Sequence, residues 1–356
     1  MGLIRDRILY FSVSDISDVG DQRRKTAAFA KELGFLPGDS EEISILVTEM
    51  MNNMLNHGGP DSRLIICRVE DNKKNQGIEL WAIDNGSGIN DFDQAFRDGH
   101  SSQDSLGLGL GTVKRFSDEI ETGIKAIPEE FKDRNGLRSM GGLVICSRKW
   151  LPKHSWTGRN KNITIGAASR PKPGEKINGD SYFIRHLSSQ ATLAAVVDGL
   201  GHGIDAHEAS RLAVRSLDAK ADLPLPEIIA YTHKTLIGTR GATVGAALIQ
   251  SDLNKVSFVG MGNIEARIVT PQKKHALISL GGIVGLKIRT PKVYEYIYDQ
   301  DNFLVLYSDG INSGWQNGVE EWGKHPQKIA EYILKNYSRD HDDATILIIK
   351  FSPENS

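Results

Sequence analysis

The sequence predicts an α+β protein of two domains, an N-terminal α/β sandwich followed by a C-terminal β-sandwich flanked by helices. The 356 residues exceed the usual size of one compact core. Helical patterns lead the first half, whereas strand-like runs dominate the second. Between them, residues 149–162 (KWLPKHSWTGRNKN) are polar, basic and interrupted by Pro and Gly. We therefore expect domains over residues 1–150 and 163–356, joined by a linker over 151–162.

Apolar spacing in the first half indicates two helices followed by three strands. These elements are expected at residues 18–33, 39–56, 64–69, 78–84 and 143–147. Residues 84–118 are rich in Gly, Ser and Asp and lack clear apolar periodicity. A connection of that length is rarely idle, so this segment is expected to be a mobile lid.

Short apolar runs in the second half indicate a layered β-sandwich with helices outside it. Strands are expected at residues 192–198, 242–249, 255–260, 303–309 and 345–351. Helices are expected at residues 206–219 and 327–335.

Composition excludes several classes of partner. The chain has 43 basic and 45 acidic residues, so neither nucleic acid nor a membrane surface is an expected partner. No apolar stretch has the length of a membrane span, and the N-terminus lacks the apolar block of a signal peptide. Cys67 and Cys146 lie in apolar strand-like runs, which favours reduced core thiols and a cytoplasmic location.

The stretch VTEMMNNMLNHGG places Glu49 and Asn53 four residues apart, on one face of a helix that ends at His57 and Gly58. A carboxylate and an amide stacked in this way can hold a divalent cation or a water. A polar helix face with a glycine C-cap explains the same letters.

Two glycine motifs follow. In AIDNGSGI, Asp84 ends an apolar strand and is followed by Gly86 and Gly88, a pattern that can receive a flat ligand against bare backbone. In SLGLGLGTVKRFSDE, glycines alternate before a helix expected to begin near Thr112, where backbone N–H groups and the helix dipole favour a phosphate. These alternating glycines are Gly107, Gly109 and Gly111. Either motif alone is weak support, because turns and flexible loops also supply glycines.

In this order and spacing, the three motifs resemble the N, G1 and G2 boxes of the GHKL (Bergerat) nucleotide-binding fold of histidine kinases and anti-sigma-factor serine kinases. The resemblance extends over residues 8–150 to the RsbT-type switch kinases, through GLGTVKRFSDEIE and LVICSRKW. It implies that Asn53 binds the Mg²⁺ bridging ATP phosphates, Glu49 acts as general base and Asp84 reads adenine. The motif glycines would wrap the phosphates. Gly111 departs from the proline common in these kinases, which implies a looser lid.

Carboxylates in the second half lie where buried strands meet loops. They are Asp180 in NGDSYF, Asp198 ending LAAVVD, Asp309 ending FLVLYSD, and Asp342 and Asp343 before ATILIIK. Converging carboxylates repel one another strongly unless cations lie between them. Ion pairs with Arg or Lys are the alternative, but basic residues are scarce in these motifs. Oxygen ligands without His or Cys favour Mg²⁺ or Mn²⁺.

Six segments, NGDSYF, VVDGLGHG, GATVGAALI, VGMGNIEARI, LYSDGI and DDAT, resemble the SpoIIE/RsbX branch of the type 2C metal-dependent protein phosphatases over residues 162–351. The resemblance implies that Asp180 and Asp198 bridge two metal ions and act in catalysis. It adds the Gly199 carbonyl, Asp309 and Asp342 as further metal ligands.

Other polar residues of these segments have less specific readings. Asp343 is expected to lie behind the metal ligands or in the loop, and His202 is expected to be a loop residue rather than a proton donor. Gly262 and Asn263 are expected to shape a turn. Arg170 is the nearest candidate for a phosphate-binding arginine, though a weak one.

Together the two resemblances imply a cytoplasmic bifunctional regulator that uses ATP and Mg²⁺ or Mn²⁺. One half would phosphorylate serine or threonine, and the other would remove the phosphate, on a STAS-domain anti-sigma antagonist or stressosome-type protein. A sigma factor or a downstream phosphatase is a further candidate partner. One alternative is a binding module, in which the first half sequesters a sigma factor or STAS protein and only the phosphatase is active. Another is a scaffold inert in both halves.

Overall fold

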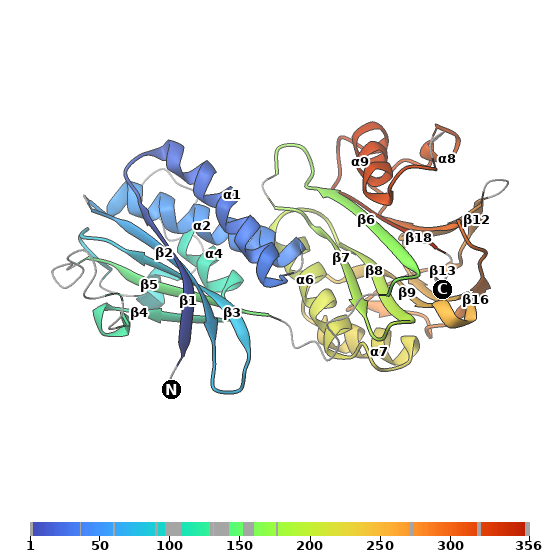
Figure 1. Ribbon diagram of the computed structural model, residues 1–356, viewed down its shortest axis with the longest axis horizontal. Helices are drawn as coiled ribbons and strands as arrows, with labels where there is room; N and C mark the ends of the chain where they lie inside the picture. The colour runs from blue at the N-terminus through green and yellow to red at the C-terminus, as the bar shows by residue number, and fades with distance from the viewer. Residues whose placement is uncertain are drawn as a thin grey trace. The chain divides into compact units, whose positions relative to one another are not determined.

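The computed structural model divides the chain into two compact units, residues 1–153 and 154–356 (Figure 1). The described residues are 3–35, 37–59, 61–89, 92–96, 109–128, 131, 142–151, 160–175, 177–270, 274–318 and 322–352. The boundaries of the linker expected over residues 151–162 stay a prediction.

The helices of the first unit begin with α1 (Ile16–Leu33) and α2 (Pro37–His57), which pack against each other. Helix α1 begins two residues before the predicted start because Asp15 and Asp18 form a capping box. The Asp15 carboxylate accepts from the Ser17 N–H at 2.7 Å, and the Asp15 N–H donates to Asp18 at 3.2 Å. Gly34, with φ of 97°, ends the helix in the left-handed conformation.

One antiparallel sheet completes the first unit, in the order β1-β2-β3-β5-β4. Its strands are β1 (Ile4–Ser12), β2 (Arg63–Glu70), β3 (Gln76–Ile83), β4 (Glu119–Thr122) and β5 (Val144–Trp150). Helices α2 and α4 (Gly109–Phe116) contact the sheet, and the short elements α3 (Phe92–Ala95) and η1 (Ile124–Ala126) lie in the connections. The two edge strands, β1 and β4, were not predicted.

The second unit is a sandwich of two sheets. One sheet has the order β13-β10-β9-β8-β7, with β16 also pairing β10, and the other has the order β12-β11-β17-β18-β6. Its strands are β6 (Ile163–Arg170), β7 (Asp180–His186), β8 (Ala191–Gly199), β9 (Ala242–Gln250), β10 (Lys255–Met261), β11 (Glu265–Val269), β12 (Lys274–Ala276), β13 (Ser279–Leu280), β16 (Tyr294–Ile297), β17 (Phe303–Tyr307) and β18 (Ala344–Phe351). A separate hairpin joins β14 (Gly282–Ile283) to β15 (Lys287–Ile288).

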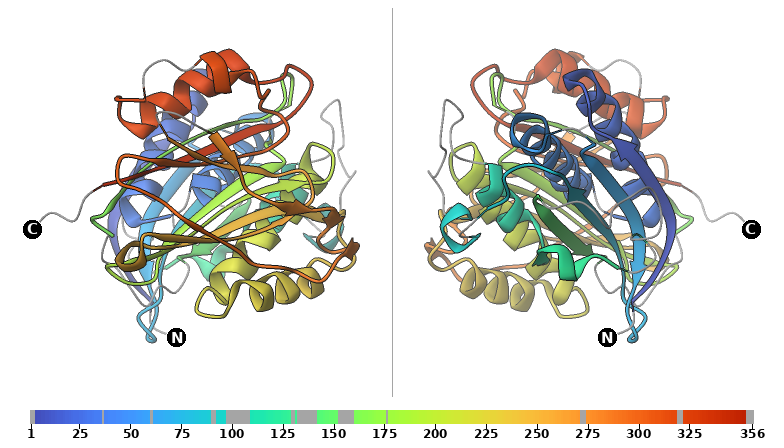
Figure 2. Two further views of the ribbon diagram at one scale, coloured as in Figure 1. Left: turned by 90° about the vertical axis from the view of Figure 1, so that its right-hand side faces the viewer. Right: turned by 90° about the vertical axis from the view of Figure 1, so that its left-hand side faces the viewer.

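Helices cover the outer faces of this sandwich, as the left view of Figure 2 shows. Helices α6 (Ile204–Ala219) and α7 (Leu225–Thr235) pack on the sheet that contains β8 and β9, and α9 (Pro326–Tyr337) packs on β6 and β18. The apolar core between the sheets includes Phe258 and Leu347, both fully buried. The predicted β-sandwich flanked by helices is confirmed, although α7, the strands β6, β7 and β11 and several shorter strands were not predicted. Among the described residues, no helix is both long and apolar enough to cross a membrane.

Candidate functional site

Two predicted site residues of the second unit face each other across neighbouring strands. Asp180 begins β7, and its antiparallel register partner is Asp198, near the end of β8. Paired residues project to the same side of a sheet. For Asp180 that side faces the other sheet, because its Oδ2 accepts a hydrogen bond from Ser308 Oγ at 2.6 Å, just beyond β17. Asp180 is 4% exposed, so this hydrogen bond lies inside the sandwich.

Asp309 is linked to this pair through an amide that the sequence did not single out. Asn263 Nδ2 donates to Asp309 Oδ2 at 2.6 Å. The Asn263 Oδ1 accepts from Thr243 Oγ1 at 2.6 Å, and Thr243 is the register partner of Asp198 on β9. Asn263 lies in the turn between β10 and β11, as expected, and its amide makes these two contacts in addition. It orients Asp309 and connects it to the strand next to Asp198.

The carboxylates act on one another electrostatically. Burial and repulsion from Asp198 raise the pKa of Asp180 well above its usual range. Burial, together with the charges of Asp309 and Asp342, raises the pKa of Asp198 to about 7. Burial and the charge of Asp342 also raise the pKa of Asp309. Mutual elevation of this kind indicates carboxylates from distant parts of the sequence gathered at one end of the sandwich.

Basic side chains of the described residues do not form ion pairs with these acids. Within the described part of the chain, none of Asp180, Asp198, Asp309, Asp342 and Asp343 forms an ion pair with Lys or Arg, so the alternative of structural ion pairs is not what the structure contains. The Asp343 Oδ2 is buried without a hydrogen bond, while its Oδ1 accepts from the Lys172 N–H at 2.8 Å.

The spacing of these acids is nevertheless wider than that of a complete set of metal ligands in the described residues. Over the described residues, no three His, Cys, Asp or Glu side chains are grouped closely enough to hold a metal ion as they stand. Carboxylates that repel one another stay apart until a cation lies between them. The chemistry of the proposed donor set, carboxylate oxygens and the Gly199 carbonyl without His or Cys, fits a hard divalent ion.

The glycine after Asp198 has a packing reason. A Cβ at Gly199 would overlap the carbonyl of Ala206 in the first turn of α6, so only glycine allows the strand end and the helix to approach this closely. In the loop between them, His202 Nδ1 lies 3.0 Å from Glu175 Oε1. His202 is thus a loop residue with a carboxylate partner.

In the first unit, Glu49 and Asn53 of α2 lie beside the first residue of α4. A Cβ added at Gly109 would lie 3.3 Å from Asn53 Oδ1 and 3.4 Å from Glu49 Oε2, so both side chains face this glycine. Asn53 Nδ2 is buried, and among the described residues it has no hydrogen-bond partner. An orphaned amide beside a carboxylate is a polar position that is suited to an absent ligand.

Asp84 is held at the end of β3 by backbone groups. Its Oδ1 accepts from the Gly86 and Leu143 N–H groups, both at 2.9 Å, and described residues give its Oδ2 no hydrogen bond. A Cβ at Gly86 would overlap the carbonyl oxygen of His57, at the end of α2. The first two motifs therefore pack directly on each other. Gly88, with φ of +70°, needs the conformational freedom of glycine.

The third motif differs from its prediction. Helix α4 begins at Gly109 rather than near Thr112, so Gly109 and the buried Gly111 are helical and not part of a loop. Close packing of α4 on α2 explains the earlier start, because glycine at these positions adds no side chain between the two helices. Gly107 lies outside the described residues.

Comparison with known proteins agrees with this division. Residues 13–126 match the family model described as histidine kinase-like ATPase domain. Residues 188–352 match the model described as stage II sporulation protein E (SpoIIE).

Two curated relatives from Bacillus subtilis (strain 168) each match one half. The chain is 35% identical to serine/threonine-protein kinase RsbT over 103 residues, which are 29% of this chain and 76% of that protein. It is 22% identical to phosphoserine phosphatase RsbX over 194 residues, which are 54% of this chain and 97% of that protein. The chain spans 26% of the stage II sporulation protein E of the same organism, at 24% identity.

A solved structure also shares the second fold. The structure described as "The bacterial stressosome: a modular system that has been adapted to control secondary messenger signaling" covers 53% of this chain and 100% of its own, with 22% identity and a TM-score of 0.50. At that identity the likeness concerns the fold alone.

Fold and sites together define a kinase-like ATPase unit fused to a PP2C-type phosphatase unit. This class binds ATP and metal ions in general. The chain belongs, through its first unit, to the family of serine/threonine-protein kinase RsbT. Its second unit is similar to the SpoIIE model over residues 188–352.

Proposed function

We propose that the protein is a bifunctional partner-switching regulator. The second unit is a Mg²⁺- or Mn²⁺-dependent phosphoserine/phosphothreonine phosphatase, and the first is an ATP-dependent serine/threonine kinase. Both act on a STAS-domain protein of the anti-sigma antagonist or stressosome type, which the RsbT and RsbX relatives favour. The observation that carries the phosphatase assignment is the set of mutually repelling carboxylates at the end of the sandwich, without ion pairs to basic residues.

In the phosphatase unit, Asp180, Asp198, Asp309, Asp342 and the Gly199 carbonyl would hold the metal ions. Such ions, when bound, activate water and neutralise phosphate oxygens. The protein's own contribution is orientation. Ser308 fixes Asp180 by donating to one of its oxygens, and its hydroxyl also accepts from the Thr345 N–H at 3.0 Å. Asn263 fixes Asp309 in the same manner.

In the kinase unit, Asn53 would hold the Mg²⁺ that accompanies ATP, and Glu49 would accept the proton of the substrate hydroxyl. Asp84 would accept a hydrogen bond from the exocyclic amine of adenine through Oδ2, because Oδ1 already accepts hydrogen bonds from two backbone N–H groups. Gly86, Gly88, Gly107, Gly109 and Gly111 would leave space for the nucleotide. Phosphoryl transfer depends mainly on such positioning and on charge neutralisation.

One experiment separates this proposal from its main alternative. Full-length Asp198→Asn, which disables the phosphatase, is incubated with ATP, Mg²⁺ and a STAS-domain protein, and phosphoserine and phosphothreonine are measured by mass spectrometry. We expect phosphorylation, and we expect the additional change Glu49→Ala to abolish it. Nucleotide-dependent capture of the partner without phosphorylation would instead support the binding module. Hydrolysis of an aryl phosphate by the wild type that survives EDTA would contradict the metal-dependent phosphatase.

A further inference from the structure

The phosphatase site needs a cation to receive a substrate phosphate. A phosphate ester carries close to two negative charges at neutral pH. The side chains proposed to hold the metal ions, Asp180, Asp198, Asp309 and Asp342, are all acidic, and the side chains that orient them, such as Asn263 and Ser308, are neutral. Metal ions neutralise part of this charge, and a fixed basic side chain at the rim would orient the phosphate further.

Arg170, at the end of β6, is the basic residue that the sequence offers, but four of the five N–H groups of its guanidinium already donate hydrogen bonds. Its Nε donates to Ser338 Oγ at 3.1 Å. Its Nη1 donates to the carbonyls of Pro171 and Asp342, at 2.8 and 3.2 Å, and its Nη2 donates to the carbonyl of Arg339 at 2.6 Å. Arg170 therefore fixes the backbone that leads from α9 to Asp342, and with one N–H left it cannot donate two parallel hydrogen bonds to a phosphate.

The segment that Arg170 fixes places Arg339 beside Asp309. The Arg339 N–H donates to the Gly310 carbonyl at 2.7 Å, and its own carbonyl accepts from Arg170. The neighbouring residue Ser338 forms a β-bridge with Ile311. The main chain at Arg339 is thus anchored on both sides, directly next to the turn that carries Asp309.

The side chain of Arg339, in contrast, is uncommitted. It is exposed, and no described residue forms a hydrogen bond or ion pair with its guanidinium. The hydrogen bond from the Arg339 N–H to the Gly310 carbonyl places its main chain beside the turn that carries Asp309. An anchored backbone with a free guanidinium is the arrangement expected of a residue that binds an anionic ligand.

We propose that Arg339 binds the phosphate group of the substrate at the phosphatase site, and that Arg170 is a positioning residue that holds Arg339 in place. The proposal rests on the phosphatase function proposed above. The planar guanidinium can donate two parallel hydrogen bonds to phosphate oxygens, which a lysine cannot reproduce.

The test uses full-length Arg339→Ala and Arg339→Lys, with Lys335→Ala as matched control. Lys335 is also exposed and cationic, and lies on the last turn of α9. Binding of inorganic phosphate is measured by equilibrium dialysis with Mg²⁺ and with ADP, which occupies the proposed nucleotide site. KM and kcat are measured with p-nitrophenyl phosphate, and Mn²⁺ affinity by titration calorimetry.

We expect Arg339→Ala to weaken phosphate binding and raise KM by about tenfold, the equivalent of one charge-assisted hydrogen bond, without changing Mn²⁺ affinity. Arg339→Lys should recover part of the loss, and Lys335→Ala should behave as the wild type. If Arg339→Ala keeps the wild-type phosphate affinity and KM, the proposed role of Arg339 is wrong, whereas the phosphatase function is not affected. Absence of metal-dependent hydrolysis in the wild type would overturn the phosphatase function and this proposal with it.

Discussion

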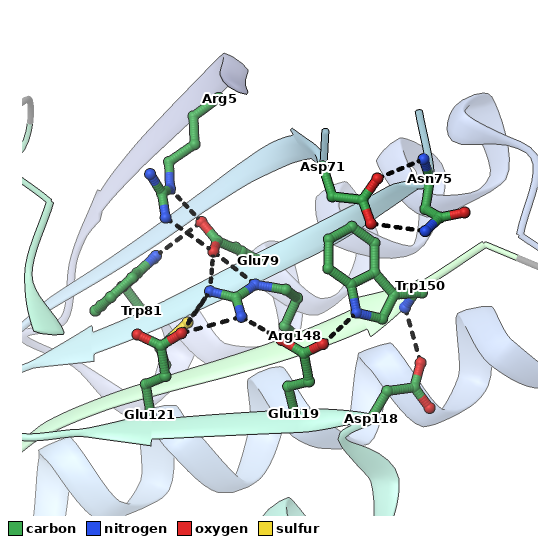
Figure 3. A network of polar contacts seen from close by, with 11 residues as sticks. Arg5, Asp71, Asn75, Glu79, Trp81, Asp118, Glu119, Glu121, Arg148 and Trp150 are labelled. Carbon is green, nitrogen blue, oxygen red and sulfur yellow. Dashed lines mark hydrogen bonds and ion pairs between the residues drawn. The ribbon is translucent and has the colours of Figure 1, made fainter. Parts of the chain in front are cut away.

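The charge cluster at the centre of the first unit's sheet yields a quantitative prediction (Figure 3). The Glu79 carboxylate, fully buried on β3, accepts from Arg5 Nε at 2.5 Å and from Arg148 Nε at 2.8 Å. It also accepts from Trp81 Nε1 at 3.3 Å. Arg148 itself is 2% exposed. We predict that Glu79→Gln destabilises the first unit, because it leaves two arginines short of their shared anion.

The size of the effect follows from burial. Removing one partner of a buried ion pair costs roughly 3–5 kcal/mol. Glutamine keeps one acceptor oxygen, and Arg148 also contacts Glu119 and Glu121, so we expect the lower end, about 3 kcal/mol. That loss corresponds to roughly hundredfold faster amide exchange through unfolding of the unit.

Hydrogen exchange of the full-length protein measures this loss unit by unit. Amides of β3 and β5 should exchange faster in Glu79→Gln, whereas those of β17 and β18 in the second unit should not change. Glu32→Gln is the control, because the pair of Glu32 with Arg7 is exposed, at 62% and 47% of the two side chains. Equal effects of the two substitutions would refute the reasoning that burial makes the Glu79 cluster important for the stability of the first unit.

Three further predictions concern pH and close packing. Burial alone would raise the pKa of Glu79, but Arg5 and Arg148 outweigh burial and lower it. The stability that this carboxylate gives the first unit should therefore be complete above its ordinary pKa and decline as the pH falls below it. Amide hydrogen exchange of β3, followed against pH, measures this decline. In the metal-free protein, the pKa of Asp198 at about 7 means that the contribution of its protonated form to the stability of the second unit should be complete below pH about 4 and lost as pH rises through about 7. Thermal scans in EDTA of the wild type and Asp198→Asn, which cannot ionise at this position, check this, because the difference between them should grow with pH; added Mn²⁺ should reverse the wild-type loss at pH 7. Gly86→Ala should lower the unfolding free energy of the first unit by roughly 1–3 kcal/mol and weaken ATP binding. The control Gly20→Ala, whose Cβ would meet only Arg24 at 3.7 Å inside α1, should raise the unfolding free energy by roughly 0.5–1 kcal/mol. Equal effects of the two substitutions in denaturant titrations would contradict the packing argument.

Much of the fold could be predicted from local patterns. The apolar spacing of α1 and α2 is that of helices with one buried face, and the runs around β8, β9 and β18 are continuous because both of their faces are covered. Strand β1 escaped prediction because charged residues interrupt its apolar pattern and a bulge lies between Asp6 and Leu9. Strands β12 to β15 have two or three residues each, too few to show any period.

The candidate site could be predicted in its residue types but not in its connections. Asp180, Asp198 and Asp309 stand out because each follows or begins an apolar run. Their mutual contacts depend on the register between β7 and β8 and on which sheet each strand joins, which no local pattern fixes. The amide contacts of Asn263 and the candidate role of Arg339 were missed because the features that matter are a long-range hydrogen bond and a free guanidinium.

The central claim is that carboxylates of the second unit bind divalent cations. Titration calorimetry of Mn²⁺ into full-length protein without nucleotide, at pH 7.5, tests it most directly, with Asp198→Asn beside the wild type. The account predicts saturable binding to the wild type, with proton release only from the fraction of Asp198 that is still protonated at this pH, and loss of most of that binding in Asp198→Asn. Undiminished Mn²⁺ binding in Asp198→Asn, or none in the wild type, would contradict it.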